Sequence, residues 1–473
     1  MSCEPPSGCP SGFQIGAEGR GAHNEPRLAS QLQTIEVEEL PPFDEIKHGQ
    51  VYAVRLGSNT TDLTHGLHRF PAKFIPQIPR WALQQFGRQE GCVVVDPFMG
   101  SGTTLVEGLV DGGVTVGVDI DPLARLIAHA KTDLPSSARI AQLGDAIRRS
   151  WPGPATRLVP PMPDLVDFEH WFSCDAWSKL QSLHHTLGLL ECSEEERRFL
   201  LALFSSILRW VSNADDQSQK TYVSGTNHKR PPEVLDTYWR GFERAVAGLR
   251  QLEAAKAPHS RVVISDAGDA TSLGLAPRSV DLIVTSPPYV DSVDYMYNFM
   301  LEYFWLGPTL GIPDRRSFNR LRRRQIGAKS PERAPEVTPE IISDLIDERA
   351  LSRHRRQAVV AYFVGMWHHF LEASRCMRTG ARYVLVVGNS QTRTNILPVH
   401  DCLVRLAAAS GLELEKAFAY RVRRHYMKFP RQGRGGIILI DWIVVLRRAD
   451  RAAAIPERLP LPWVTLREDA VAN

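Results

Sequence analysis

A hydrophobic run that enters a glycine turn constrains the fold of this chain more than any other feature. The run Cys92 to Asp96 is followed by Pro97-Phe98-Met99-Gly100-Ser101-Gly102-Thr103-Thr104, and apolar residues then recur at helical spacing up to Gly112-Gly113. This pattern predicts a strand, a tight turn and a helix, which is the first unit of a doubly wound, mostly parallel α/β sheet. Glycines let the backbone approach a ligand closely, and the free N–H groups of a helix start favour an anion.

Two other ligand classes use glycine turns, and this turn fits neither. A phosphate-binding P-loop requires a Gly-Lys-Ser/Thr sequence, and a dinucleotide site requires a third glycine where Leu105 stands. The second predicted strand, Val114 to Val118, ends at Asp119, roughly twenty residues after the turn, where a carboxylate can bind a ribose diol. Asp121 and Pro122 predict an N-cap and first residue of the next helix.

A third buried-type run, Leu282-Ile283-Val284, stops at Thr285-Ser286-Pro287-Pro288-Tyr289. Two prolines cannot donate to a sheet ladder and they stiffen the backbone, so the Ser286 hydroxyl and the local carbonyls are held with little entropy to lose. Such acceptors beneath a tyrosine ring suit an exocyclic amine on a planar base, with Tyr289 stacking on that base.

The glycine turn and the Thr-Ser-Pro-Pro-Tyr segment together resemble the S-adenosylmethionine-dependent DNA amino-methyltransferases, which methylate N4 of cytosine or N6 of adenine. The resemblance covers about residues 65–130 and 262–446. It implies a class I methyltransferase fold, S-adenosylmethionine as cofactor and double-stranded DNA as partner. The catalytic residues that it implies are Ser286, Pro287, Pro288 and Tyr289. The cofactor-binding residues that it implies, together with the ribose carboxylate, are Phe74, Asp96, Phe98, Gly100, Gly102, Thr103, Asp119 and Asp269.

Two further segments match this family. His65 to Pro76 is similar to the family segment that folds over the methionine end of the cofactor, and Gly268-Asp269-Ala270 is similar to its adenine-contacting turn. His65 and His68 are three residues apart, but no carboxylate or cysteine joins them at ligand spacing, so no metal is expected.

The resemblance also favours one target base, through the residue at the first acceptor position, Ser286. Serine at this position is usual among the N4-cytosine enzymes of the family, whereas aspartate or asparagine is usual among the N6-adenine enzymes, so Ser286 favours cytosine N4. The cofactor motif precedes the catalytic motif, in contrast to one large group of these enzymes. N6-adenine, RNA and protein-glutamine methylation stay open, as does a nucleic-acid-binding module without catalysis.

Positive charge is concentrated outside the N-terminal region. The chain carries a net charge of +3, but residues 1–45 hold eight acids and two arginines, so the remainder carries about +9. Two acid-free basic segments lie at 315–329 and 421–434. Polyanions bind such surfaces in a salt-dependent manner. The residues expected to contact DNA are Arg320, Arg322, Arg323, Arg324, Arg423, Arg424 and Lys428.

Composition and cysteine use indicate a globular chain in a reducing compartment. The 473 residues are 43% hydrophobic, and the seven cysteines are scattered with no CxxC pair. No apolar run is long enough to span a membrane and no signal peptide is visible, so we expect a cytoplasmic protein. The resemblance adds a cognate restriction or defence nuclease as a candidate partner.

The domain boundaries are predicted from shifts in composition and apolar periodicity. They are a disordered acidic tail at 1–45, a cofactor-binding half at 46–130, a helical insertion with a possible target-recognition role at 131–260, a catalytic half with a basic loop at 311–357 inside 261–450, and a C-terminal tail at 451–473.

Overall fold

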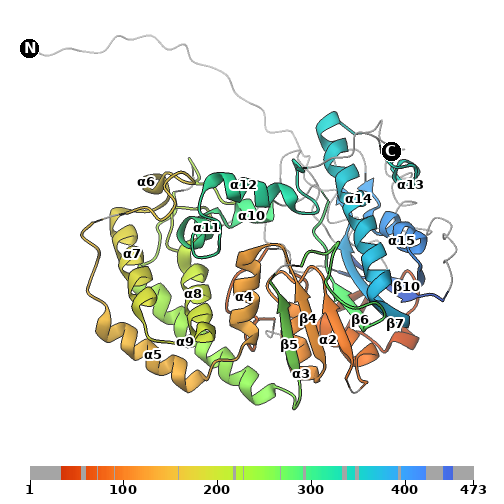
Figure 1. Ribbon diagram of the computed structural model, residues 1–473, viewed down its shortest axis with the longest axis horizontal. Coiled ribbons are helices and arrows are strands. Elements are labelled where there is room, and N and C mark those ends of the chain that lie inside the picture. The colour runs from red at the N-terminus through yellow and green to blue at the C-terminus, as the bar shows by residue number, and fades with distance from the viewer. Residues whose placement is uncertain are drawn as a thin grey trace, which may run out of the picture. The chain divides into compact units, whose positions relative to one another are not determined.

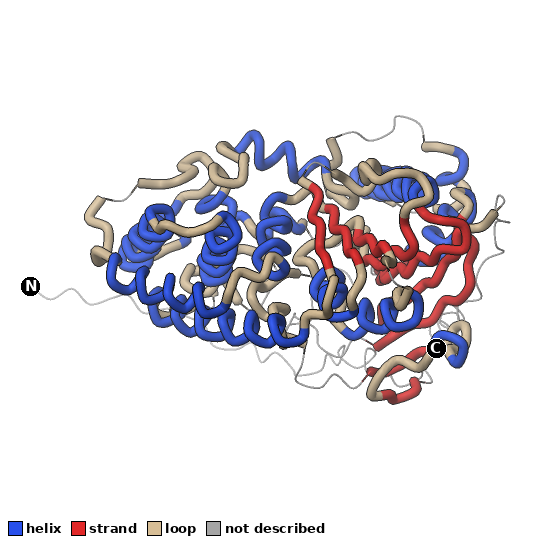
Figure 2. Tube along the Cα trace, turned by 60° about the horizontal axis from the view of Figure 1, so that its bottom comes forward, coloured by secondary structure: helices blue, strands red, loops and turns tan. Residues whose placement is uncertain are grey.

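One sheet of nine strands organises the molecule (Figures 1 and 2). In spatial order the strands are β1 (Thr34–Val37), β2 (Val51–Val54), β10 (Leu412–Arg421), β11 (Ile440–Arg448), β7 (Met377–Gly388), β6 (Val280–Thr285), β3 (Val93–Asp96), β4 (Val114–Val118) and β5 (Arg261–Ser265). Of these nine described strands, β11 alone runs antiparallel to its neighbours, β7 and β10. This is the predicted doubly wound α/β fold, in the class I methyltransferase order.

The computed structural model describes residues 34–54, 60–71, 73–89, 91–157, 159–216, 220–226, 228–266, 268–290, 294–332, 338–346, 351–391, 396–421 and 440–450. Residues 34–473 form one compact unit. Two short strands, β8 (Ser390–Gln391) and β9 (Ile396–Leu397), form a separate antiparallel pair.

The strand order places a reversal beside β3. The chain builds β3, β4 and β5 outward in one direction and then returns to lay β6 on the other side of β3. Loops at the carboxyl ends of β3 and β6 therefore lead away from each other, which opens a crevice where α/β proteins bind ligands. Both faces of these central strands are largely buried, which explains their continuous apolar runs.

Helices cover both faces of the sheet (Figure 2). Those nearest the sheet are α2 (Gln77–Phe86), α3 (Thr103–Asp111), α4 (Pro122–Thr132), α14 (Arg353–Cys376) and α15 (Val399–Ala409). Ile78 and Trp81 of α2 join a core cluster with Val94 of β3 and Val284 of β6. The predicted start of α4 is confirmed. Asp121 is the N-cap, its carboxylate accepts from the N–H groups of Leu123 and Ala124, and Pro122 is the first residue of the helix.

The region between residues 131 and 260 is helical, as expected. It contains α5 (Ser137–Ser150), α6 (Phe168–Trp171), α7 (Cys174–Leu189), α8 (Glu194–Leu208) and α9 (Val234–Ala255). Its core extends beyond the insertion, since Trp177 of α7 and Phe204 of α8 pack against Trp305 of α11 (Met300–Leu306). No helix among the described residues is long and apolar enough to cross a membrane.

Three local expectations are wrong. Residues 34–45 are not all a loose tail, because β1 pairs with β2 at the sheet edge and η1 (Phe43–Glu45) follows. The basic loop around 315–329 begins as a helix, α12 (Arg315–Arg324), since Asp314 caps it through the Ser317 N–H and Phe318 and Leu321 are buried beneath it. The sequence predicts a helix from Val359 to Arg378 that closes at Gly380; in the structure α14 ends at Cys376 and Gly380 lies within β7.

Candidate active site

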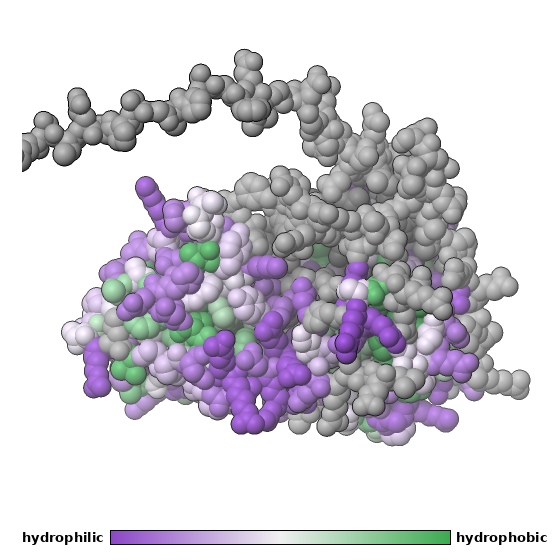
Figure 3. Space-filling view, turned by 90° about the horizontal axis from the view of Figure 1, so that it is seen from above, coloured by the Kyte–Doolittle hydropathy of each residue, from purple (hydrophilic) through white to green (hydrophobic). Residues whose placement is uncertain are grey.

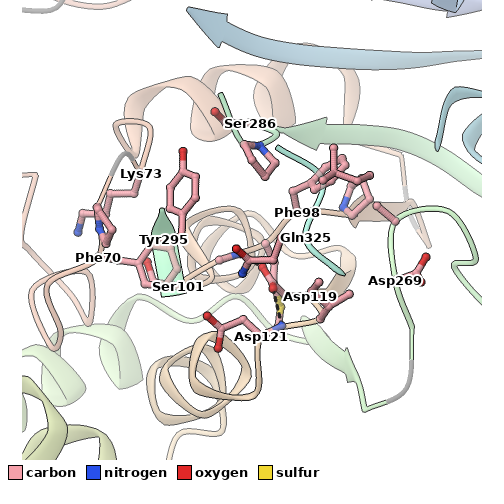
Figure 4. Close-up of a pocket in the computed structure, with 18 of the residues that line it drawn as sticks. Phe70, Lys73, Phe98, Ser101, Asp119, Asp121, Asp269, Ser286, Tyr295 and Gln325 are labelled. Carbon is pink, nitrogen blue, oxygen red and sulfur yellow. Dashed lines mark hydrogen bonds between the residues drawn. The ribbon is translucent and has the colours of Figure 1, made fainter. Parts of the chain in front are cut away.

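A pocket lies at the carboxyl ends of β3, β4, β5 and β6 (Figure 4). Four adjacent parallel strands deliver one segment each to it: the glycine turn, the Asp119 loop, the Asp269 turn and the catalytic turn at Ser286. Its lining includes the predicted residues Phe74, Phe98, Gly100, Thr103, Asp119, Asp269, Ser286 and Pro288. The residues Asp96, Gly102, Pro287 and Tyr289 do not line it.

Asp96 is a brace beneath the pocket. Its carboxylate is fully buried and accepts hydrogen bonds from the hydroxyls of Thr104 and Thr285, each at 2.6 Å, and from the Phe98 N–H at 3.2 Å. Burial raises the pKa of Asp96 to about 6. These contacts tie the end of β3 to α3 and to the end of β6, so Asp96 fixes the glycine turn and the catalytic turn relative to each other.

Asp119 lies at the end of β4 and holds the glycine turn in place. Its carboxylate accepts from the Gly100 N–H and from the Asp121 N–H, both at 2.9 Å. Burial, and then the nearby Asp121 carboxylate, raise the pKa of Asp119 to about 7. Gly100 has φ +47, a backbone conformation that residues with a side chain rarely adopt. A Cβ at this position would also lie 3.0 Å from the Phe70 ring, so a side chain is disfavoured by conformation and by space.

The start of α3 offers donors to an anion. Gly102, with φ +75, is the N-cap residue of the helix, and no side chain caps the free N–H groups. A Cβ on Gly102 would lie 3.1 Å from the Cβ of Ala128, so a side chain does not fit there. Ser101 also lines the pocket, and its buried hydroxyl has no hydrogen-bond partner within the described residues. A ligand carboxylate placed here would satisfy that hydroxyl and the helix N–H groups.

The segment that precedes α2 forms another wall of the pocket. Phe70, Pro71, Lys73 and Phe74 all line it. Burial lowers the pKa of Lys73 to about 8, and its ammonium donates to the His65 carbonyl at 3.0 Å. The sequence indicated this segment but not the individual residues Lys73 and Ser101. Lys73 and the start of α3 are far apart in the sequence, and only the fold brings them to one pocket.

The two histidines of this segment have structural partners. His65 Nε2 lies 2.8 Å from a Glu107 carboxylate oxygen, and His68 Nε2 lies 2.9 Å from the Ser205 hydroxyl. Burial lowers the pKa of His68 to about 3. Within the residues that the structure describes, no three His, Cys, Asp or Glu side chains gather as a metal site would require.

The turn after β5 lies across the pocket from the segment that contains Phe70. Asp269 Oδ1 accepts from both the N–H and the hydroxyl of Thr271, at 2.8 and 2.6 Å, which fixes the carboxylate at the pocket edge. Phe98 also lines the pocket, and its ring meets His369 of α14 at 4.9 Å in an edge-on contact. Apolar rings and fixed carboxylates together suit a heterocycle that carries N–H and O–H donors.

The catalytic turn is fixed from behind. Tyr289 donates its hydroxyl to Asp441 of β11 at 2.9 Å, and Tyr420 of β10 donates to the other oxygen of the same carboxylate at 2.9 Å. Ser286, three residues before Tyr289, lines the pocket. Tyr295, six residues after Tyr289, is the tyrosine that lines the pocket (Figure 4).

Three consecutive residues, Arg324, Gln325 and Ile326, complete the pocket from the end of α12. Sequence reasoning missed Tyr295, Gln325 and Ile326 as lining residues. They carry no motif, and only the packing of α12 over the catalytic turn brings them to the strand ends.

The arginines of α12 do not act as one set. Arg322 pairs with Asp294, which caps α10 (Tyr295–Asn298), and its guanidinium lies 5.3 Å from the centre of the Tyr297 ring. Arg320 and Arg323 are exposed and line a surface hollow with Arg315 and Arg316. Hydrophilic side chains gather near the middle of the face seen from above (Figure 3). Arg423, Arg424 and Lys428 lie outside the described residues.

Known proteins resemble this chain over most of its length. The type II methyltransferase M.MvaI from Kocuria varians is 28% identical over 414 residues, which cover 82% of this chain and 88% of the relative. The type II methyltransferase M.BsoBI from Geobacillus stearothermophilus is 20% identical, covering 85% of this chain and 89% of the relative. The chain is similar to two type II methyltransferases over more than four fifths of its length. The resemblance inferred from its motifs is thereby confirmed.

Two other comparisons add no functional argument. No protein-family profile matches the chain. Among solved structures, the rRNA methyltransferase aviRa from Streptomyces viridochromogenes superposes with a TM-score of 0.33 at 12% identity, covering 84% of this chain and 94% of that one. The relationship to type II methyltransferases therefore rests on the sequence relatives and agrees with the order of strands in the sheet.

Proposed function

We propose that this type II methyltransferase relative transfers a methyl group from S-adenosylmethionine to the exocyclic amine of a flipped base in double-stranded DNA, and that the base is cytosine, methylated at N4. The observation that carries the proposal is the meeting of Gly100, Asp119, Asp269 and Ser286 in one pocket at four adjacent strand ends. The type II names of the relatives support DNA as the substrate and a cognate restriction nuclease as a partner.

The pocket residues fit S-adenosylmethionine. The unpartnered Ser101 hydroxyl, the uncapped start of α3 and the Lys73 ammonium suit the methionine carboxylate. The Asp119 carboxylate suits the ribose hydroxyls, and Asp269 suits the adenine amine. When bound, the cofactor supplies a methyl group on a positively charged sulfur.

Ser286, which lines the pocket, accepts one N–H of the target amine, and the sequence motif assigns the second N–H to the carbonyl of Pro287, the next residue along the chain. In that position the nitrogen lone pair turns out of conjugation with the ring and points toward the methyl donor. The nitrogen forms its new bond to carbon as the carbon–sulfur bond breaks, and the excess proton on nitrogen then leaves to water. No covalent bond to the protein is needed.

Base stacking belongs to the aromatic side chains around the catalytic turn. The sequence motif assigns it to Tyr289, whose hydroxyl is held by Asp441 beside the pocket. Tyr295 and Phe70 present rings within the pocket itself. A Tyr295→Ala variant with weakened base binding and unchanged cofactor affinity would support Tyr295 as a contact of the base.

Nucleoside mass spectrometry of DNA treated with the protein and labelled cofactor tests both parts of the proposal. Label in N4-methylcytidine is expected. Label in N6-methyladenosine would replace the base assignment and keep the mechanism, because Ser286 could hold either amine. Label in RNA or protein and none in DNA would overturn the DNA substrate. Cofactor binding without any transfer would support a non-catalytic nucleic-acid-binding module.

A further inference from the structure

A second cavity, of about 310 Å³, adjoins the active-site pocket under the end of α12. The two share a wall made of Tyr295, Gln325 and Ile326. The remaining lining residues of this second cavity are Asp294, Asn319, Arg322, Arg323, Gly327, Ala328, Lys329 and Ser330. Nothing in the proposed methyl transfer uses this space.

The cavity lies directly behind the catalytic turn. Gly327 has φ +88, and a Cβ there would stand 3.4 Å from Pro288 Cβ and 3.5 Å from the Tyr289 carbonyl oxygen. The segment after α12 therefore packs on the two residues that follow Pro287. A group bound in this cavity would be separated from a base held at Ser286 only by the shared wall of Tyr295, Gln325 and Ile326.

The charges of the cavity favour an anion. Its one acidic lining residue, Asp294, already pairs with Arg322 and also accepts from the Tyr297 N–H at 3.1 Å. No ion pair among the described residues involves Arg323 or Lys329, although Arg323 also lines the outer hollow with Asp164 and Glu332. Asn319 and Ser330 add neutral hydrogen-bonding groups. Two uncompensated cations with neutral donors are the chemistry that binds a phosphodiester.

We propose that this cavity binds the backbone phosphate next to the flipped nucleotide, through Arg323 and Lys329, while the base passes Gln325 and Tyr295 into the active-site pocket. This inference rests on the proposed DNA methylation. It gives α12 two functions, since its exposed outer arginines meet the duplex and its end positions the extruded nucleotide.

The sequence that the protein methylates is first identified by single-molecule sequencing of DNA from cells that express the full chain. The test then uses a short duplex that contains this sequence. One version of the duplex carries a neutral methylphosphonate beside the target nucleotide. The rate constant kcat/KM for labelled methyl transfer is measured with both duplexes for the wild type, Arg323→Ala, Lys329→Ala and the control Arg316→Ala. Arg316 is exposed on the outer hollow of the same helix, so the control removes equal charge.

The wild type should lose about tenfold on the methylphosphonate duplex, which is the effect of one lost charge-assisted contact. On the natural duplex, kcat/KM of Arg323→Ala and of Lys329→Ala should be lower than that of the wild type by a similar factor. Replacing the phosphate by the methylphosphonate should then lower kcat/KM of these two variants little further. Arg316→Ala should stay as sensitive as the wild type.

Equal sensitivity of all four proteins to the methylphosphonate would overturn the phosphate assignment while leaving DNA methylation intact. Inhibition of the wild type but not of Arg323→Ala or Lys329→Ala by inorganic phosphate, together with no effect of the methylphosphonate, would instead identify a site for the free ion and would also overturn it. Failure of the wild type to label the natural duplex would overturn the proposed function and this inference together. Cofactor affinity, measured by calorimetry, should be the same in all four proteins and confirms that each is folded.

Discussion

The cofactor side of the pocket and the α12 side are built by opposite means. On the cofactor side, Asp96, Asp119 and Asp269 are each fixed by hydrogen bonds to the loops that they position. On the α12 side, Arg315, Arg316, Arg320 and Arg323 are exposed, and the buried Phe318 and Leu321 anchor the helix beneath them. One side fixes acceptors in advance, and the other presents exposed cations on a helix that is anchored by its buried face.

The difference follows from what each side must bind. A small cofactor needs acceptors at set positions, and buried, hydrogen-bonded carboxylates lose little freedom on binding. A DNA backbone offers repeated charges, which long exposed side chains can meet at low desolvation cost. Arg322 stands between these cases, because its pairing with Asp294 gives it the fixed character of the cofactor side.

The largest expected effect is on catalysis and concerns Ser286. Ser286→Ala should lower kcat by about 100-fold, because the target amine loses one acceptor in a preorganised site. Cofactor affinity should not change, since Asp119 and Asp269 are held by their own hydrogen bonds, which do not involve Ser286. Single-turnover transfer and calorimetry measure the two quantities. A variant with normal kcat would remove the serine from the mechanism.

Next in size is the loss of the ribose carboxylate. Asp119→Ala should weaken cofactor binding by roughly 1–3 kcal/mol, because the Gly100 N–H and the cofactor hydroxyls lose their acceptor. Asp145→Ala, which removes an exposed carboxylate from α5, is the matched control and should bind normally. If both variants bind equally well in calorimetry, Asp119 does not belong to the cofactor site.

A smaller effect concerns pH. The pKa of Asp119 is raised by burial to about 7, so the carboxylate is ionised only above that pH, and the ionised form accepts hydroxyl donors best. Cofactor affinity should therefore weaken several-fold as pH falls from about 8 to about 6. Asp119→Asn should flatten this dependence. In the unliganded protein the same shift should lower stability as pH rises toward 7, because the folded state retains a proton that the unfolded chain has released.

The smallest expected effects separate the arginines of α12. Substituting Arg320 and Arg323 by alanine should reduce the salt slope of DNA binding by about 0.9 for each lost phosphate contact. Arg322→Ala should change the slope less and instead cost about 0–1 kcal/mol of stability, since its ion pair with Asp294 is partly exposed. Binding titrations over a range of salt concentrations, with thermal melts, give both. If the salt slopes of the Arg320→Ala, Arg322→Ala and Arg323→Ala variants are equal, Arg322 does not differ from its neighbours in DNA binding.

The segments that follow the central strands could be predicted from the sequence, because each is marked by a local pattern. The glycine turn, the carboxylate after β4, the Asp269 turn and the Thr-Ser-Pro-Pro-Tyr segment each lie within a few residues of an apolar run, and parallel strands carry such segments to one edge. The N-cap at Asp121 was also predicted correctly, because it depends on neighbours in the chain.

The tertiary structure alone decided which residues share a wall. Asp96 became a brace and not a pocket residue because Thr104 and Thr285 reach it from two elements. Asp441 holds Tyr289 from 152 positions away. Lys73, Tyr295 and Gln325 meet in one pocket. Local pattern encodes strands, turns and caps, whereas the partners of a side chain depend on packing between distant segments, which no spacing along the chain records.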